Sequence, residues 1–202
     1  FPYTTLFRSG YSYGQRLECI RDDHGLTIIS ISIGQGEVLL TPLQIANLGA
    51  TIANRGYYYI PHIIKASEGV EIDPKYYEKQ FTKVSTEHFP KVVKGMWRAV
   101  NSGAGMGGTA WIAHIDGLDV CGKTGTAQNP RGADNSVFIC FAPMDNPKIA
   151  IAAYVENGGF GATYAAPMAS LMVEKYLKGE VRREDLEKRM KEANLMSRVK
   201  KD

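Results

Sequence analysis

The sequence has 202 residues, enough for one medium domain with a hydrophobic core. Its formal charge of +3 is small and scattered along the chain, so the composition does not favour nucleic-acid binding. The chain contains no apolar run of about eighteen residues, so none of its predicted helices would span a membrane.

The cysteines and histidines do not point to a metal site. The three cysteines are an odd number without C-x-x-C spacing, and the four histidines lie far apart in the chain. We therefore expect no metal and no cofactor.

The first nine residues, 1–9, resemble an in-frame translation of a short-read sequencing adapter. Such scars are left out of fold reasoning, and we expect the natural protein to continue upstream of Gly10.

The segment Leu26 to Ile33 alternates apolar and polar residues over its second half and ends at Gly34. This pattern predicts a short strand or extended segment.

A helix is predicted from Thr41 to about Asn54. Thr41 and Gln44 have the spacing of a capping box, and Pro42 suits the first helical position. The polar residues of this helix form one narrow stripe, so we expect it to be buried on most sides.

The segment 57–82 predicts loops and short strands, and a second helix should begin between Ser85 and Pro90. One face of that helix would carry five apolar side chains: Phe89, Val92, Val93, Met96 and Val100. The segment Ser102 to Gly108 is too rich in glycine to continue it.

Three extended segments follow: Leu118 to Thr126, Val137 to Ala142 and Lys148 to Glu156. The loops between them are too short for parallel crossovers, so they predict an antiparallel meander. The second and third segments are apolar on both faces and need helices on both sides.

Two helices are predicted after the strands. The first runs from Pro167 to Lys178, where Glu174 and Lys178 have the spacing of an i,i+4 ion pair, and the second, from Arg182 to Asn194, is charged. The predicted fold class is α/β (α+β), an antiparallel sheet covered by helices.

The strand that contains Lys123-Thr124-Gly125-Thr126 carries the clearest chemical pattern. A lysine cation and two threonine hydroxyls can bind a carboxylate, and Gly125 allows another backbone to approach closely. A peptide could lie alongside as an added strand, with a backbone N–H near Thr126 facing a developing oxyanion. Lys-Thr-Gly is the third element of the penicillin-binding protein and β-lactamase motif set, although it also occurs by chance in about one chain in twenty of this length.

Longer stretches resemble class B penicillin-binding proteins, and most closely the penicillin-binding protein 2 type of cell elongation. These stretches are SIGQGEVLLTPLQIANLGATIANRGYYYIPHI (32–63), GKTGTAQNP (122–130) and FICFAPMDNPKIAIAAYVENGGFGATYAAP (138–167). The resemblance implies a β-lactamase/transpeptidase-like fold present as a partial domain. Its expected extent is residues 10–179, with a charged C-terminal helix and tail at 180–202.

The resemblance implies a serine D,D-transpeptidase that cross-links peptidoglycan stem peptides and is acylated by β-lactams. Lys123 and Thr126 would be catalytic, and Thr124 and Gly125 would bind substrate. Lys123 would set the electrostatics of the carboxylate pocket, while Thr124 and Thr126 would hold the carboxylate. The Thr126 amide would help to form the oxyanion hole.

The nucleophile is missing from this pattern. No Ser-x-Asn occurs, and the single Ser-x-x-Lys, Ser197 to Lys200, follows Lys-Thr-Gly, whereas the family places it well before. We interpret it as a chance match, and we expect the serine to lie upstream of Gly10. As printed, the chain is expected to be inactive and to expose apolar faces that the rest of the domain should cover.

The resemblance also implies an N-terminal anchor in the bacterial inner membrane, a periplasmic catalytic domain and a membrane glycosyltransferase partner.

Cys121 and Cys140 fall in adjacent expected strands and could lie opposite each other. Two buried free thiols are favoured over a disulfide, which an oxidising compartment would permit.

Three alternatives stay open: a D,D-carboxypeptidase or β-lactamase of the same fold, a non-catalytic β-lactam sensor or degenerate binder, and an unrelated α/β protein with a chance Lys-Thr-Gly. Phe160 and Tyr164, in the glycine-rich connection after the last strand, could reach the substrate cleft.

Overall fold

A computed structural model describes residues 26–35, 38–62 and 72–195. The chain divides into two parts, residues 1–39 and 40–202, which are described separately. The helices are α2 (Leu26–Ser32), α3 (Pro42–Ala53), η2 (Pro74–Tyr76), η3 (Thr86–His88), α4 (Phe89–Asn101), η4 (Trp111–Ala113), α5 (Ala165–Lys178) and α6 (Glu184–Lys191). The strands are β1 (Tyr57–Tyr58), β2 (Gln80–Phe81), β3 (Cys121–Ala127), β4 (Asn135–Ala142) and β5 (Ile149–Val155). None of the described helices is long and apolar enough to cross a membrane.

The segment Leu26 to Ile33 is not extended, so its prediction as a strand is wrong. It forms α2, in which the Ser32 hydroxyl donates to the Ile28 carbonyl at 2.6 Å. The helix ends before Gly34, which has a positive φ of 78°. Local hydrogen bonds decide the conformation here, whereas an alternating pattern forms a strand only when a sheet partner pairs with its backbone.

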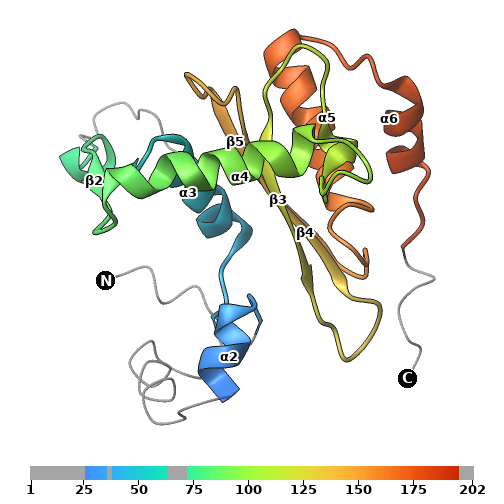
Figure 1. Cartoon of the computed structure of the whole chain (residues 1–202), viewed down its shortest axis with the longest axis horizontal. Helices are drawn as coiled ribbons and strands as arrows, with labels where there is room; N and C mark the ends of the chain where they lie inside the picture. The colour runs from blue at the N-terminus through green and yellow to red at the C-terminus, as the bar shows by residue number, and fades with distance from the viewer. Residues whose placement is uncertain (1–25, 36–37, 63–71, 196–202) are drawn as a thin grey trace. The chain divides into compact units, whose positions relative to one another are not determined.

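The main part contains a three-stranded antiparallel sheet in the order β3-β4-β5, as the meander prediction required (Figure 1). The register pairs Gly122 with Cys140, Thr124 with Phe138 and Thr126 with Ser136. Within the described residues, β3 and β5 are the two edge strands. A smaller antiparallel pair joins β1 and β2.

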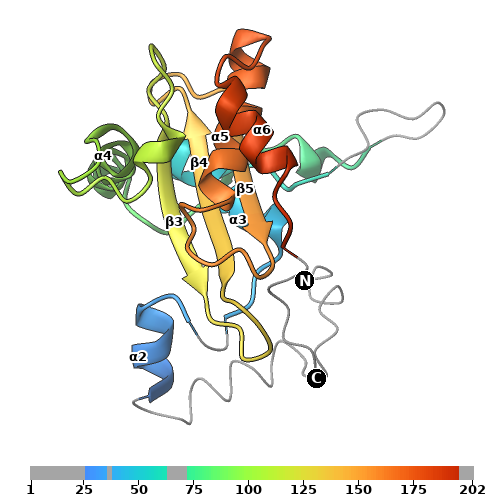
Figure 2. The same ribbon diagram turned by 90° about the vertical axis from the view of Figure 1, so that its right-hand side faces the viewer.

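Helices cover both faces of this sheet, as predicted from its two-sided apolar strands (Figure 2). On one face, α5 and η4 pack over a core that contains Phe138, Cys140 and Val173. On the other face, α3 and α4 pack over Cys121 and Phe141. The sheet is therefore the middle layer of a helix–sheet–helix arrangement.

Helix α3 begins as the sequence predicts, because Thr41 and Gln44 form the capping box. It is not buried on most sides, however. Its close contact with the sheet is made by small residues such as Gly49, while Leu43 and Leu48 are 57% and 48% exposed. Met172 and Tyr176 on α5 are also exposed, so the expectation of uncovered apolar surface is confirmed at these positions.

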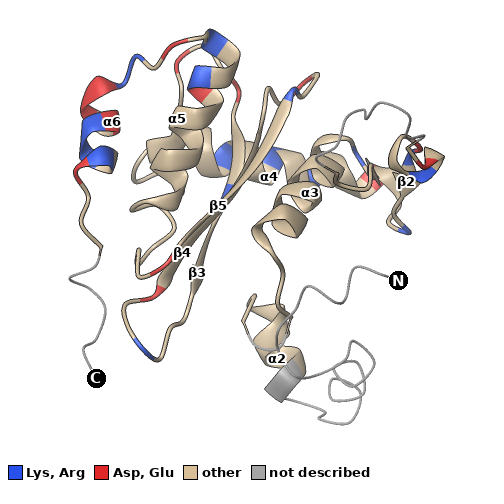
Figure 3. Ribbon diagram, turned by 180° about the vertical axis from the view of Figure 1, so that it is seen from behind, with Lys and Arg blue, Asp and Glu red and all other residues tan. Residues whose placement is uncertain are grey.

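Helix α4 buries four of its five predicted apolar residues: Phe89, Val93, Met96 and Val100. Val92 is 46% exposed, so the buried stripe of this helix is narrower than predicted. The charged C-terminal helix is shorter than expected, since α6 covers only Glu184–Lys191. In Figure 3 most of the α6 ribbon has the colours of charged residues, whereas the strands are mainly tan.

Cys121 and Cys140 are both buried and free. They do not lie opposite each other, because Cys140 pairs with Gly122 and Cys121 pairs with Phe141. Neighbouring residues of a strand point to opposite faces, so the two thiols belong to different cores.

Adding a methyl group at Gly122 should destabilise the sheet. A Cβ there would come within 2.8 Å of Cε2 of the buried Phe138 ring, and closer still to its Cζ. We expect Gly122→Ala to lower the free energy of unfolding by about 1–3 kcal/mol through overpacking. Urea denaturation followed by circular dichroism measures the effect. The control is Gly95→Ala in α4, where a Cβ would meet nothing within 4 Å. This change should raise the free energy of unfolding by about 0.5–1 kcal/mol, because alanine favours the helix more than glycine does. Equal effects of the two changes would contradict the packing.

The two thiols should make the protein sensitive to alkaline pH. Burial raises the pKa of Cys121 and Cys140 from 9.0 to about 12. Above pH 9 the unfolded chain loses thiol protons that the folded chain keeps. The contribution of the thiols to the free energy of unfolding should therefore be constant below pH 9 and then fall by about 1.4 kcal/mol per pH unit per thiol up to pH 12. Urea denaturation between pH 8 and 10.5 measures this decline. Cys121→Ser should make the decline shallower than in the unmodified chain, and an unchanged slope would count against the burial effect.

Candidate functional site

Strand β3 presents the Lys-Thr-Gly residues at an edge of the sheet. Lys123 is exposed, and its Nζ donates to the Thr124 carbonyl at 2.6 Å. Backbone groups two residues apart in a strand point to the same side, so the Thr126 amide faces the same way as this carbonyl. The Lys123 contact and the Thr126 amide therefore lie along the same side of β3.

The two threonines of the motif share one face of β3. Thr124 and Thr126 pair with the buried Phe138 and Ser136, and both threonines are themselves partly exposed. The Thr124 hydroxyl lies 3.4 Å from that of Thr109, which follows the glycine-rich segment after α4. Sequence reasoning did not identify Thr109. The only signal for it was its place at the end of the glycine-rich run.

Gly125 is the point at which another part of the chain touches β3. Gly161, in the connection between β5 and α5, lies directly on the backbone. A Cβ at Gly161 would come within 2.6 Å of the Gly125 carbonyl oxygen and 3.0 Å of its nitrogen. This contact is on the face that carries the threonine side chains, whereas a Cβ at Gly125 would point to the other face and meet Val137. The predicted approach of a ligand backbone at Gly125 therefore stays a prediction.

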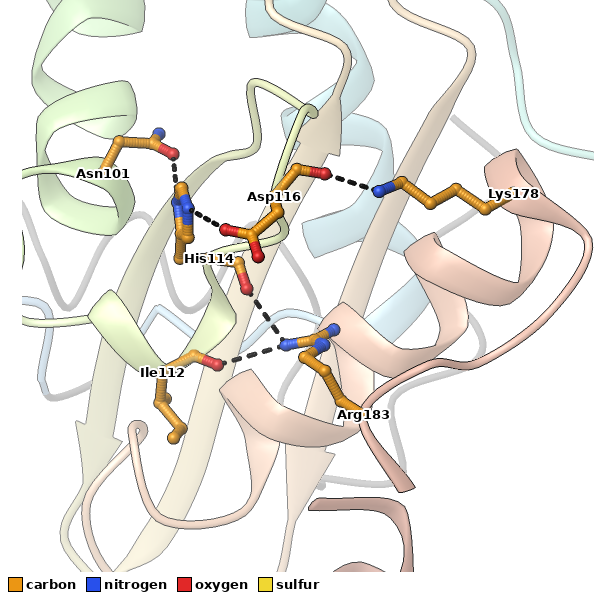
Figure 4. A network of polar contacts seen from close by, with 6 residues as sticks. All are labelled: Asn101, Ile112, His114, Asp116, Lys178 and Arg183. Atoms are coloured by element: carbon orange, nitrogen blue, oxygen red, sulfur yellow. Dashed lines mark hydrogen bonds and ion pairs between the residues drawn. The ribbon is translucent and has the colours of Figure 1, made fainter. Parts of the chain in front are cut away.

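A polar network anchors the chain just before β3 (Figure 4). The Asn101 amide nitrogen donates to the Val120 carbonyl at 2.9 Å, and the Asn101 amide oxygen lies 2.9 Å from Nδ1 of His114. Nε2 of His114 lies 3.2 Å from the Asp116 carboxylate. These contacts tie the end of α4 to the residue that precedes Cys121, and so fix where β3 begins.

The same network reaches α5 and α6. Arg183 donates from Nε to the Glu174 carboxylate at 2.9 Å and from Nη1 to the Ile112 and His114 carbonyls at 3.3 and 3.2 Å. Lys178 donates to the Asp116 carbonyl at 2.5 Å. The predicted Glu174–Lys178 pair is therefore wrong. Glu174 is only 2% exposed, so its carboxylate needs a cationic partner that reaches the interior. The planar guanidinium of Arg183 provides this partner.

A groove of about 930 Å³ lies elsewhere, between β5, α5 and α6. Its walls are mostly apolar and include Ile149, Met172 and Tyr176, but none of the motif residues. The residues predicted to bind a carboxylate are on β3 and not in this groove. We therefore place the candidate functional site at β3.

The fold and the motif strand together define a class of proteins. The chain matches the penicillin binding protein transpeptidase domain over residues 10–174. It belongs to the penicillin-binding protein transpeptidase family.

Individual relatives agree with this assignment. The chain is 34% identical over 170 residues to the peptidoglycan D,D-transpeptidase MrdA of Haemophilus influenzae, covering 74% of this chain and 25% of the relative. Among solved structures, Pseudomonas aeruginosa PBP2 in complex with WCK 5153 aligns with a TM-score of 0.67 and 30% identity, over 86% of this chain and 38% of that chain. The imipenem acyl-enzyme of penicillin-binding protein A from M. tuberculosis aligns with a TM-score of 0.61 and 32% identity, over 73% of this chain and 33% of that chain. The chain thus spans about a quarter of the length of the first of these relatives.

Replacing Glu174 tests the network that anchors β3. Its side chain is 3% exposed and that of Arg183 is 22% exposed. Glu174→Gln should leave the guanidinium without a charged partner and lower the free energy of unfolding by about 2 kcal/mol, below the full range for buried pairs because Arg183 is partly solvated. Urea denaturation measures this loss. The control is Glu187→Gln on α6, which breaks a more exposed pair with Lys191 and should cost less than about 0.5 kcal/mol. Equal losses would contradict a special role for the buried pair.

Proposed function

We propose that this chain is the Lys-Thr-Gly portion of a peptidoglycan D,D-transpeptidase that works through a serine acyl-enzyme. The observation that carries the proposal is the placement of Lys123, Thr124 and Thr126 along one edge strand of a chain that belongs to this family. Relatives named peptidoglycan D,D-transpeptidase and an acyl-enzyme structure of a relative support the chemistry.

In the proposed reaction, a serine oxygen attacks the carbonyl carbon of the terminal D-Ala–D-Ala bond. The tetrahedral intermediate collapses to an ester, and the terminal D-Ala leaves after its amine gains a proton. The amine of a neighbouring stem peptide then attacks the ester, forms the cross-link amide and gives up one of its own protons to the departing serine oxygen. A β-lactam acylates the same serine as its strained amide bond opens.

The residues of β3 have separate tasks in this scheme. Lys123 gives the site a positive potential for the substrate carboxylate, and the Thr124 and Thr126 hydroxyls donate hydrogen bonds to it. Gly125 keeps the strand narrow where the substrate backbone lies alongside. The Thr126 N–H donates to the oxyanion, a contact worth about 10²–10³ in rate for a single donor.

The nucleophile is proposed to come from a segment outside the 202 residues. Within them, no Ser-x-Asn occurs, and Ser-x-x-Lys occurs only at Ser197, outside the described residues. The first relative is about four times as long as the stretch it shares with this chain, which leaves room for the missing motifs. We propose that the printed chain alone is not acylated.

The wider setting of the protein is also a proposal. Because the relatives act on peptidoglycan, we place the catalytic domain on the periplasmic side of a bacterial inner membrane, held by an anchor outside this chain. A membrane glycosyltransferase that polymerises the glycan strands would be its partner. No cofactor is required by the serine chemistry.

Covalent labelling with a fluorescent penicillin tests the proposed reaction. The whole protein encoded by the gene should become labelled at one serine, and the 202-residue chain should not. Lys123→Ala in the whole protein should slow labelling about 10- to 100-fold, the value of a hydrogen bond or ion contact to a charged group. Lys148→Ala is the matched control, since this exposed lysine precedes β5 and should leave the rate unchanged.

Four outcomes would overturn parts of this proposal. A covalent adduct on the printed chain would place the nucleophile within it. An unlabelled whole protein would favour a degenerate binder. If mass spectrometry of D-Ala–D-Ala substrates with an amine acceptor finds only hydrolysis, the protein is a carboxypeptidase. Rapid turnover of the penicillin itself would instead identify a β-lactamase.

A further inference from the structure

The two-stranded ribbon formed by β1 and β2 gathers aromatic side chains on one of its sides. Tyr57 and Phe81 are register partners, so they point to the same side, and their ring centroids lie 6.3 Å apart. Tyr59, two residues after Tyr57, packs edge-on against it with 6.1 Å between the centroids. Lys79 lies over the Tyr57 ring, with its Nζ 4.4 Å from the centroid. We name these four side chains the aromatic face of the ribbon.

The ribbon that carries the aromatic face is anchored at one buried residue, Gly56. Its N–H donates to the Thr51 carbonyl of α3 at 2.9 Å, and its carbonyl accepts from the Thr82 N–H at 2.9 Å. A Cβ at Gly56 would meet the ring of Phe89 at the start of α4. Because Gly56 precedes β1 and Thr82 follows β2, these contacts hold both strands against α3 and α4.

The rings of the aromatic face remain accessible on this anchored backbone. Phe81 is 73% exposed and Tyr59 is 40% exposed. None of the three rings belongs to the two buried cores that cover the main sheet. An aromatic ring on a fixed backbone can bury apolar surface on a ligand with little loss of conformational freedom. The aromatic face is therefore suited to contact a ligand.

Lys79 gives the aromatic face a positive charge. Lys75, in the same segment, forms an ion pair with Asp73 at 2.7 Å. Lys79 forms no such pair with any carboxylate among the residues that the structure describes, and its described contact is the Tyr57 ring. Its ammonium therefore stays hydrated or meets an acidic group supplied by a ligand.

An acidic polysaccharide fits the aromatic face better than a protein partner does. Aromatic residues are enriched at protein–protein interfaces, but lysine is depleted there, and Lys79 lies among the rings. The C–H groups of a sugar ring form an apolar face whose partial positive charge matches the negative face of an aromatic ring. Sugar hydroxyls can also pair with tyrosine hydroxyls, and a linked carboxylate complements the lysine.

We propose that the aromatic face binds a glycan strand of peptidoglycan. Phe81 and Tyr59 stack on its sugar rings, and Lys79 pairs with a carboxylate of a stem peptide. The inference rests on the proposed function, which supplies the polymer, and it adds a contact that uses none of the motif residues of β3. Two contacts with one polymer raise the effective concentration of stem peptides at the motif strand.

Cosedimentation of the whole protein with purified peptidoglycan sacculi tests the stacking. The serine is first blocked with benzylpenicillin, so that binding at β3 does not contribute. The double variant Tyr59→Ala and Phe81→Ala should raise the apparent dissociation constant for sacculi about tenfold, the value of lost aromatic contacts. Phe81→Leu keeps an apolar side chain but loses the ring, and should also weaken binding.

The charge contact has its own test in the same assay. Lys79→Ala should raise the dissociation constant for intact sacculi about threefold, the value of an exposed ion pair. Sacculi from which an amidase has removed the stem peptides should bind this variant and the unmodified protein equally. An equal loss on both preparations would contradict the pairing with a stem-peptide carboxylate.

The matched control is Tyr176→Ala on α5, because Tyr176 is also an exposed ring, at 64%, and is not part of the ribbon. It should not change sedimentation, and every variant should be acylated by benzylpenicillin at the unmodified rate. The inference is overturned if the blocked protein does not sediment with sacculi, or if the double variant and Phe81→Leu bind as tightly as the unmodified protein. If benzylpenicillin does not acylate the unmodified protein, the proposed function fails, and the same comparison of variants still decides the role of the aromatic face. Thermal melting of each variant should match the unmodified protein, and if the double variant does not fold, Phe81→Leu alone decides the stacking.

Discussion

The register between β3 and β4 is the constraint on which the remaining structure depends. It places Gly122 against the Phe138 ring, aligns Thr126 with Ser136 and separates the two cysteines onto different faces. A slip of one residue would turn one of the two strands over: either Phe138 and Cys140 would leave the core beneath α5, or the threonine side chains would leave the face that they share with these residues. The same pairing thus sets both the packing of the sheet and the geometry of the candidate site.

The two sheet faces have different relations to the site. The face covered by α3 and α4 is mainly a packing surface, where small residues allow helix and sheet to approach closely. On the other face, the connection between β5 and α5 (residues 156–164) is held beside the end of β3, and the polar network around Arg183 holds the chain before β3 begins. Buried polar groups therefore concentrate on the face of the sheet to which Thr124 and Thr126 point, where precise placement matters most.

Much of this fold could be predicted from local pattern. Capping at Thr41, helical spacing in α4 and short loops between apolar strands each report directly on secondary structure, and all three elements were found. The Leu26–Ile33 segment failed because alternation describes a strand only when a partner is present. The Glu174–Lys178 pair failed because helical spacing does not reveal that Glu174 is buried or that Arg183 can reach it.

The candidate site could be predicted only in part, for a related reason. Lys123 to Thr126 form a continuous motif, so a single stretch of sequence identifies them. Ser136 and Gly161 act through contacts with residues 10 or more positions away in the chain, and their roles depend on the β3–β4 register and on the path of a loop. Sequence periodicity carries no information about either. The hydroxyl of Thr109 was missed in the same way.

The contact between Gly161 and Gly125 has a consequence for how the protein can change. A side chain introduced at Gly161 would meet the Gly125 nitrogen and the carbonyl oxygens of Gly125 and Val137, all of them backbone atoms. No second substitution can shorten a backbone, so such a change has no compensating partner nearby. At Gly122 the obstacle is the ring of Phe138, which a smaller residue could replace. A side chain at position 161 therefore requires the connection between β5 and α5 to move away from β3, whereas one at position 122 requires only a smaller residue at position 138.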